Sequence, residues 1–331
     1  MQINKLDIIN KNYILLDWNV IKYLKKPRND TDKETKRLLT NVRKKYELPF
    51  CEAHLRDLAR SFSENNKDKV NEDLVFLQEL TQGTVLGMDE NEKFLLTKQS
   101  VFSFFQEIIN ENPSKPNITP EMNPQSIIKV DMQKLDANHP MREELERTGG
   151  VWGPGIMSNW LNSMFDKLFD EIDDYKKYRE YIKKLKRDLQ ENSQDGLILQ
   201  DKMYREYLSQ HMMPFLDALE IENSDDLVVV WKAVITKWLQ MNYGNNIPFG
   251  EFITTAYVML DLHPLFKEKL KKKKNTLSNI TRDSKIVYYA SNSKYFITED
   301  NGCYEKIKFV YRALEIDTKV LKMSEFVRKF S

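Results

Sequence analysis

Cysteine and histidine are scarce in this 331-residue sequence, which contains two cysteines, Cys51 and Cys303, and four histidines. Two cysteines so far apart exclude a disulfide-based scaffold and a cysteine-rich zinc module. The histidines lack the short spacing that metal-binding histidines share. Such sparing use of cysteine is typical of a reducing compartment, so we expect a cytoplasmic protein.

Long apolar runs and an excess of one charge are also missing. No run of 18 apolar residues occurs, so we expect no membrane span and no membrane partner. Residues 1–11 are polar around one short apolar patch, which does not match a secretory signal. The 51 basic and 50 acidic residues give a net charge of +1. This balance excludes a strongly basic coat protein, and nucleic-acid binding would need a local basic patch.

The composition that is present, 41% hydrophobic and 11% aromatic, is typical of a globular protein. The first part of the chain alternates between strand-like apolar runs and helical patterns, which favours a parallel α/β sheet. We predict strands over residues 13–17, 48–51 and 84–87, and helices over 32–46, 52–62 and 68–80.

The pattern changes in the middle of the chain. Two loop-like segments, at 112–124 and 149–155, come first. Long helical signals follow from residue 156 to residue 274, and no fixed-period repeat is visible. The α/β pattern then returns with a helix opening at Asp283, a strand over 295–298, a turn at Asn301–Gly302, and strand-like segments at 306–310 and 318–321. We therefore predict an α/β core formed by residues 1–87 and 278–331, interrupted by a large, mostly α-helical insertion over residues 88–277.

Acidic residues follow the predicted strands. Asp17 ends the first strand and Asp300 follows the strand over 295–298, while Glu52 and Asp57 follow the second strand and Asp283 opens a helix. The carboxyl ends of parallel strands meet at one edge of a sheet, where ligands bind. Clustered carboxylates repel one another and favour a bound cation. Oxygen ligands suit Mg²⁺, and two such metals can activate water for phosphodiester cleavage.

These segments resemble the PIN-like nucleases. Residues 13–21 read Tyr-Ile-Leu-Leu-Asp-Trp-Asn-Val-Ile, which is similar to the opening strand of that family with its D-x-N-V element. Residues 48–58 resemble its strand-to-helix element with the second acid. Residues 282–286 and 295–300 resemble its acid at a helix start and its T-x-D strand end. The insertion over 88–277 is a departure, since compact members of the family lack it.

The resemblance implies a three-layer α/β/α fold, bound Mg²⁺ or Mn²⁺, and cleavage of RNA or, less often, DNA. It implies that Asn19 and Thr298 orient the metal ligands. Glu52 and Asp57 compete for the position of the second acid, and they lie about 140° apart around a helix; motif position favours Asp57. The implied metal ligands are Asp17, Asp57, Asp283 and Asp300, with Glu52 as a further catalytic candidate.

Each acid also has an ordinary structural explanation. Asp17 and Asp283 could cap helices, and Asp300 could belong to a turn. Glu52 would be favoured in the first turn of a helix by the helix dipole. His54 is expected to be a surface histidine rather than a catalytic base.

A basic run precedes the last α/β segment. It could be a solvated helix end, or it could hold the phosphates of a nucleic acid. The residues concerned are Lys271, Lys272, Lys273, Lys274 and Arg282.

The function that we expect is metal-dependent cleavage of RNA by an endoribonuclease. The resemblance makes a toxin or an antiviral defence effector a reasonable setting. The alternatives are a DNA nuclease on the same fold, and an inactive PIN-like module that binds or assembles with partners. A protein regulator and a homo-oligomer both remain open.

Overall fold

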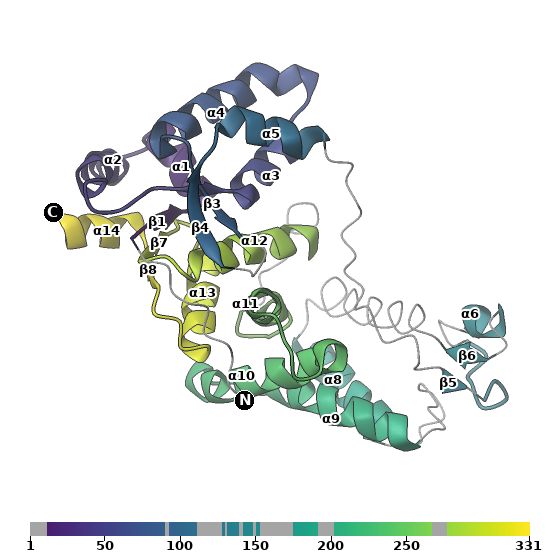
Figure 1. Ribbon diagram of the computed structural model, residues 1–331. Coiled ribbons are helices and arrows are strands. Elements are labelled where there is room, and N and C mark those ends of the chain that lie inside the picture. Colours follow the sequence, from purple (N-terminus) through teal and green to yellow (C-terminus); the bar gives the residue numbers. More distant parts are fainter. Residues whose placement is uncertain are drawn as a thin grey trace. The chain divides into compact units, whose positions relative to one another are not determined.

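The computed structural model describes residues 12–89, 93–110, 128–129, 131–138, 142–147, 150–152, 175–190, 202–266 and 277–331. The chain divides into two compact units. The first comprises Met1–Ser114 and Thr276–Ser331, and the second comprises Lys115–Asn275. Figure 1 shows that the two ends of the chain build the first unit together.

The strands of the first unit form two small sheets. In one, β1 (Ile14–Leu16), β7 (Tyr295–Ile297) and β8 (Lys319–Leu321) are parallel, in the order β1-β7-β8. In the other, β2 (Phe50–Cys51) is parallel to β3 (Thr84–Met88), which pairs antiparallel with β4 (Phe94–Lys98). The first unit is therefore a mixed α/β structure with a small parallel sheet.

An isolated parallel bridge between Tyr13 and Glu47 joins the two sheets. The amide of Ile14 donates to the carbonyl of Glu47 at 2.9 Å, while the amide of Asp17, on the other edge of the same strand, donates to Ile297 at 2.8 Å. The chain therefore continues from β1 toward β2 and β3 on one side, and returns as β7 and β8 on the other side. The strand order reverses beside β1, and ligands bind at such points in open α/β sheets.

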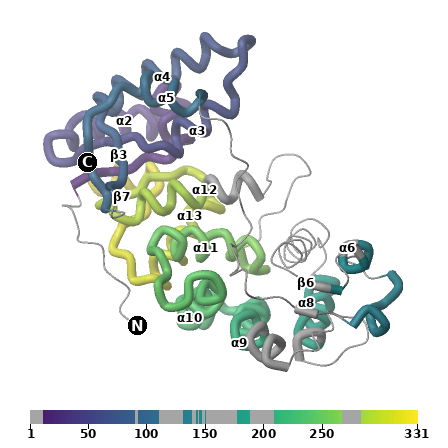
Figure 2. Tube along the Cα trace, turned by 45° about the vertical axis from the view of Figure 1, so that its right-hand side comes forward, coloured from purple at the N-terminus to yellow at the C-terminus, as the bar shows by residue number. Residues whose placement is uncertain are grey.

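Helices connect these strands. The helix α1 starts directly after β1, and α3 starts directly after β2, so both begin at a strand end. The helices of the first unit are α1 (Trp18–Lys25), α2 (Asp30–Val42), α3 (Glu52–Ser61), α4 (Lys67–Thr81), α5 (Val101–Asn110), α12 (Leu277–Ala290), α13 (Asn301–Ala313) and α14 (Met323–Phe330), with a 3-10 turn at Glu64–Asn66. Figure 2 shows α4 and α5 of the first unit lying side by side.

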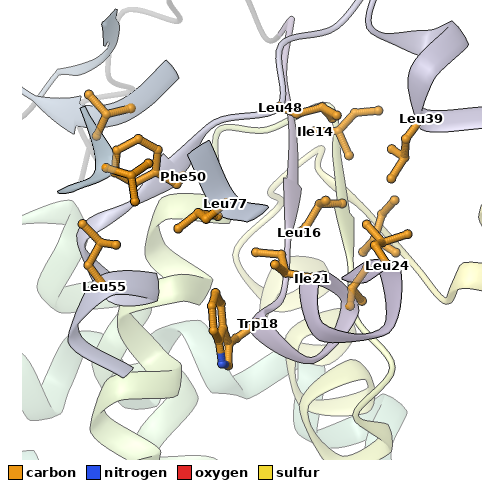
Figure 3. Packing of buried hydrophobic residues seen from close by; sticks show 14 of the residues in the cluster. Ile14, Leu16, Trp18, Ile21, Leu24, Leu39, Leu48, Phe50, Leu55 and Leu77 are labelled. Atoms are coloured by element: carbon orange, nitrogen blue, oxygen red, sulfur yellow. The ribbon is translucent and has the colours of Figure 1, made fainter. Parts of the chain in front are cut away.

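The apolar strands are buried on both faces. Ile14 and Leu16 belong to one large core cluster, which Figure 3 shows extending to Ile21 of α1 and to Leu55 of α3. Successive strand residues point to opposite faces. Leu15 accordingly points away from this cluster and is also fully buried. Burial on both faces explains the continuous apolar run that precedes Asp17.

The second unit is mostly helical in its described part. The longest helix in that part, α10 (Ser224–Tyr243), packs against α9 (Lys202–Ala218), where the ring centres of Phe215 and Trp238 lie 5.5 Å apart. The other described elements are α6 (Arg142–Arg147), α8 (Tyr175–Gln190), α11 (Phe249–Leu260) and the antiparallel pair β5 (Ile128–Lys129) and β6 (Val151–Trp152).

Several local predictions were wrong. Residues 306–310 are helical within α13 rather than strand-like, and Asn301–Gly302 forms the first turn of that helix. Asp283 lies inside α12 rather than at its start. The first unit continues past residue 87 to Ser114, because β4 pairs with β3 and α5 packs against α3. Among the described helices, none combines the length and apolar character that a membrane crossing requires.

Candidate functional site

Asp17 lies at the carboxyl end of β1, and its side chain does not cap the helix that follows. Its carbonyl accepts a hydrogen bond from the amide of Ile21 at 3.1 Å, so its backbone caps α1. Its carboxylate makes no capping hydrogen bond to that helix end. The strand thus fixes the backbone of Asp17, and its half-buried side chain can interact with the neighbouring strand end.

Thr298, just after β7, links two of the expected acids. Its buried hydroxyl donates to Oδ2 of Asp17 at 2.9 Å and accepts from the amide of Asp300 at 3.2 Å. The amide of Thr298 donates to Leu321 of β8 at 3.1 Å, which fixes its backbone. One hydroxyl therefore holds the carboxylate of Asp17 beside the segment that carries Asp300.

Asp300 combines helix capping with a place at this strand end. Its Oδ1 accepts from the amide of Cys303 at 2.8 Å, which makes it the N-cap of α13. The side chain is exposed. Within the described residues, Oδ2 of Asp300 accepts no hydrogen bond, so this carboxylate retains one oxygen for another ligand.

The electrostatics of Asp17 reflect this crowding of acids. Burial raises the pKa of Asp17 to about 6. The hydrogen bond from Thr298 lowers this pKa, whereas the negative charges of Asp300 and Asp57 raise it. A carboxylate that is buried beside like charges is stabilised by a nearby cation.

Of the two acids on α3, Asp57 has the clearer connection to Asp17. Its side chain is half-buried, and its negative charge raises the pKa of Asp17, although less than burial and the charge of Asp300 do. Glu52 instead pairs with Arg56 one turn further along the helix, and its Oε2 lies 3.5 Å from the hydroxyl of Tyr289. The charge interaction with Asp17 therefore favours Asp57 over Glu52 as the acid associated with the strand-end pair.

His54 is buried, so the prediction of a surface histidine was wrong. Its Nδ1 accepts from the amide of Cys51 at 3.0 Å, which leaves Nε2 to donate to the carbonyl of Leu16 at 2.8 Å. Burial lowers the pKa of His54 to about 4. The neutral ring therefore ties the residue before Asp17 to the start of α3, and it is not a general base.

The other expected site residues have weaker connections. Asp283 is exposed on α12, a helix that packs against α3. Asn19 is half-buried on α1, and within the described part its side chain makes no hydrogen bond to Asp17 or Thr298. Arg282 lies in α12, but its side chain falls outside the described residues. So do all four lysines of the basic run, Lys271, Lys272, Lys273 and Lys274.

Lys322 belongs to this region although sequence reasoning missed it. Its Nζ donates to the carbonyl of Asp300 at 2.9 Å and lies 4.8 Å from the ring centre of Tyr304. Burial lowers the pKa of Lys322, and the nearby negative charges of Glu299, Asp300 and Asp17 oppose this shift. The signal was available, because Lys322 directly follows the last strand, just as Asp17 follows the first.

The donor set suits a hard cation. Asp17 and Asp300 offer carboxylate oxygens, the ligands that Mg²⁺ and Mn²⁺ prefer, and the like charges around Asp17 would be relieved by a cation. Within the described ranges, no three histidine, cysteine, aspartate or glutamate side chains stand close enough together to form a metal-binding group. The residues that fit a cation are therefore the strand-end pair, Asp17 and Asp300, and Asp57 adds negative charge from the adjoining helix.

Comparison with protein-family models, with curated proteins and with solved structures yields no match.

Proposed function

We propose that this chain is a metal-dependent endoribonuclease of PIN-like type, with a three-layer α/β/α core and a helical insertion. The observation that carries the proposal is the hydroxyl of Thr298, shared between the carboxylate of Asp17 and the amide of Asp300. This arrangement lies at the carboxyl ends of two adjacent parallel strands, where the strand order reverses. It fits the acids and the T-x-D strand end that the sequence resemblance assigns to the active site.

In this proposal Asp17 and Asp300 would hold the divalent ion, and the negative charge of Asp57 would favour its binding. Bound Mg²⁺ or Mn²⁺ would supply an activated water and would stabilise charge on the phosphodiester. Thr298 keeps the carboxylate of Asp17 oriented, and His54 ties the end of β1 to the helix that carries Asp57. Glu52 and Asp283 are the weaker candidates, since Glu52 is paired with Arg56 and Asp283 lies within α12 rather than at a strand end.

The test is cleavage of labelled single-stranded RNA and matched DNA in Mg²⁺, Mn²⁺ or EDTA. We compare the wild type with Asp17→Asn and Asp300→Asn, and use Asp30→Asn as the control. Asp30 is an exposed acid of α2, 95% accessible, so its substitution removes the same charge away from the site. We expect metal-dependent RNA cleavage that both site variants lose and the control keeps.

Two other results would change the assignment. Cleavage of DNA in preference to RNA would favour a DNA nuclease with the same residues, since the 2′-hydroxyl distinguishes the two polymers. Failure of the folded wild type to cleave either polymer would refute the nuclease proposal. It would favour an inactive binding module.

A further inference from the structure

The side chain of Lys322 is held in place by a network of contacts around the start of α14. The amide of Lys322 donates to Oε2 of Glu325 at 2.8 Å, and the hydroxyl of Tyr304 donates to the same carboxylate at 3.0 Å. The ring of Tyr304 lies under the ammonium of Lys322. This half-buried lysine is therefore positioned by its surroundings, unlike a freely moving surface lysine.

The ammonium of Lys322 points to the same strand end as the acids. It donates one hydrogen bond, to the carbonyl of Asp300, and an ammonium has three donors. The structure therefore provides a fixed cation beside the carboxylates of Asp17 and Asp300. A phosphodiester that reached those acids would meet strong repulsion unless a positive charge accompanied them.

We infer that Lys322 is the phosphate-binding residue of this site and contacts the nucleic-acid backbone beside Asp17 and Asp300. The inference rests on the proposed nuclease function, since it names the substrate group that the site would hold. Lys322 directly follows β8. The residues that follow the three parallel strands β1, β7 and β8 all lie at one edge of the sheet, which places the lysine beside the acids. A helix-capping residue alone would need no ammonium aimed at the carbonyl of Asp300.

Binding of a fluorescent single-stranded RNA decamer in EDTA tests the contact without cleavage. We would measure fluorescence anisotropy at several salt concentrations for the wild type, Lys322→Gln and Lys322→Arg. Glutamine can still donate to the carbonyl of Asp300, so Lys322→Gln removes the charge but keeps a donor. The control is Lys319→Gln, an exposed lysine at the opposite end of β8.

Loss of one phosphate contact to a single strand lowers the slope of log K against log salt by about 0.7. We expect this decrease for Lys322→Gln, the wild-type slope for Lys322→Arg, and no change for Lys319→Gln. A wild type without salt-dependent RNA binding, or a Lys322→Gln variant with the wild-type slope, would overturn the inference.

Titration of Mn²⁺ by calorimetry provides a second readout that does not depend on activity. Removing an ammonium near the acids should tighten Mn²⁺ binding by about threefold to tenfold in Lys322→Gln, because a like charge is lost. A purely structural lysine would lower the melting temperature and leave Mn²⁺ affinity unchanged or weaker, which would contradict the inference. A wild type that binds RNA through Lys322 but never cleaves it would refute only the nuclease proposal.

Discussion

Replacement of Asp17 by asparagine should stabilise the protein at neutral pH while it abolishes metal-dependent cleavage. The pKa of Asp17 is raised from 3.8 to about 6. The folded state therefore binds more protons than the unfolded state between these values, and its stability falls as the pH rises through this window. Each pKa unit corresponds to about 1.36 kcal/mol, so the ionised side chain costs at most about 3 kcal/mol above pH 6.

Asparagine removes the charge and keeps an oxygen that can accept the hydrogen bond from Thr298. Because the site is partly exposed, the full value is an upper limit, and we expect Asp17→Asn to raise the free energy of unfolding by about 1–3 kcal/mol at pH 8. At pH 4 Asp17 is largely protonated in the folded state, so the two proteins should be nearly equal in stability. His54 titrates in the same range, but both proteins share it, so it does not enter the difference.

The assay is urea unfolding at pH 4 and pH 8 in EDTA, followed by hydrogen exchange on peptides from β1 and β7. These peptides report on the first unit alone, so unfolding of the second unit does not contribute. Addition of Mn²⁺ should then stabilise the wild type, by about 2.7 kcal/mol at 100 times the dissociation constant, and stabilise Asp17→Asn much less. A variant that is less stable than the wild type at pH 8, or a gain of equal size at both pH values, would refute the reasoning.

Three further predictions concern the neighbours of Asp17. Thr298→Val removes a hydrogen bond that lowers the pKa of Asp17, so the acid limb of the pH–rate profile for cleavage should move to higher pH. The free energy of unfolding should also fall by about 1–3 kcal/mol. His54→Gln should flatten the pH dependence of stability between pH 4 and 6.5 in urea unfolding, because a buried neutral histidine loses about 3 kcal/mol of stability as the pH falls through that window. Asp57→Asn should weaken Mn²⁺ binding in calorimetry, whereas Glu52→Gln should leave it close to the wild-type value; the reverse order would identify Glu52 as the second acid.

The main elements around the site could be predicted from the sequence because its strands are continuous apolar runs. A run buried on both faces has no polar positions, and the first polar residue after it marks the strand end. This rule located Asp17 and Thr298 at strand ends, and parallel pairing of β1 with β7 then brought them together. Lys322 also follows a predicted strand, over residues 318–321, but β8 begins with the exposed Lys319 and is not a continuous buried run.

Other features depended on contacts between distant parts of the chain. His54 is adjacent to the apolar stripe of α3 in sequence, and only the carbonyl of Leu16 and the amide of Cys51 make its burial possible. Residues 306–310 were predicted to be strand-like. In α13, however, the consecutive residues Lys306 and Ile307 are both buried, a pattern that a helix permits and a half-exposed strand does not.

Asp300 shows why an ordinary structural role does not exclude a functional one. Capping of α13 occupies Oδ1, and the other oxygen of that carboxylate accepts no hydrogen bond from the described residues. Capping of α13 requires only the hydrogen bond from the amide of Cys303 to Asp300. It does not require the buried hydroxyl of Thr298, which also holds the carboxylate of Asp17. The bridge through Thr298 instead keeps Asp17 ionisable beside Asp300, at a cost in stability that folding alone gives no reason to retain. That unfavourable charge is the feature that a bound cation would relieve, and it is the strongest physical reason to expect chemistry at this strand end.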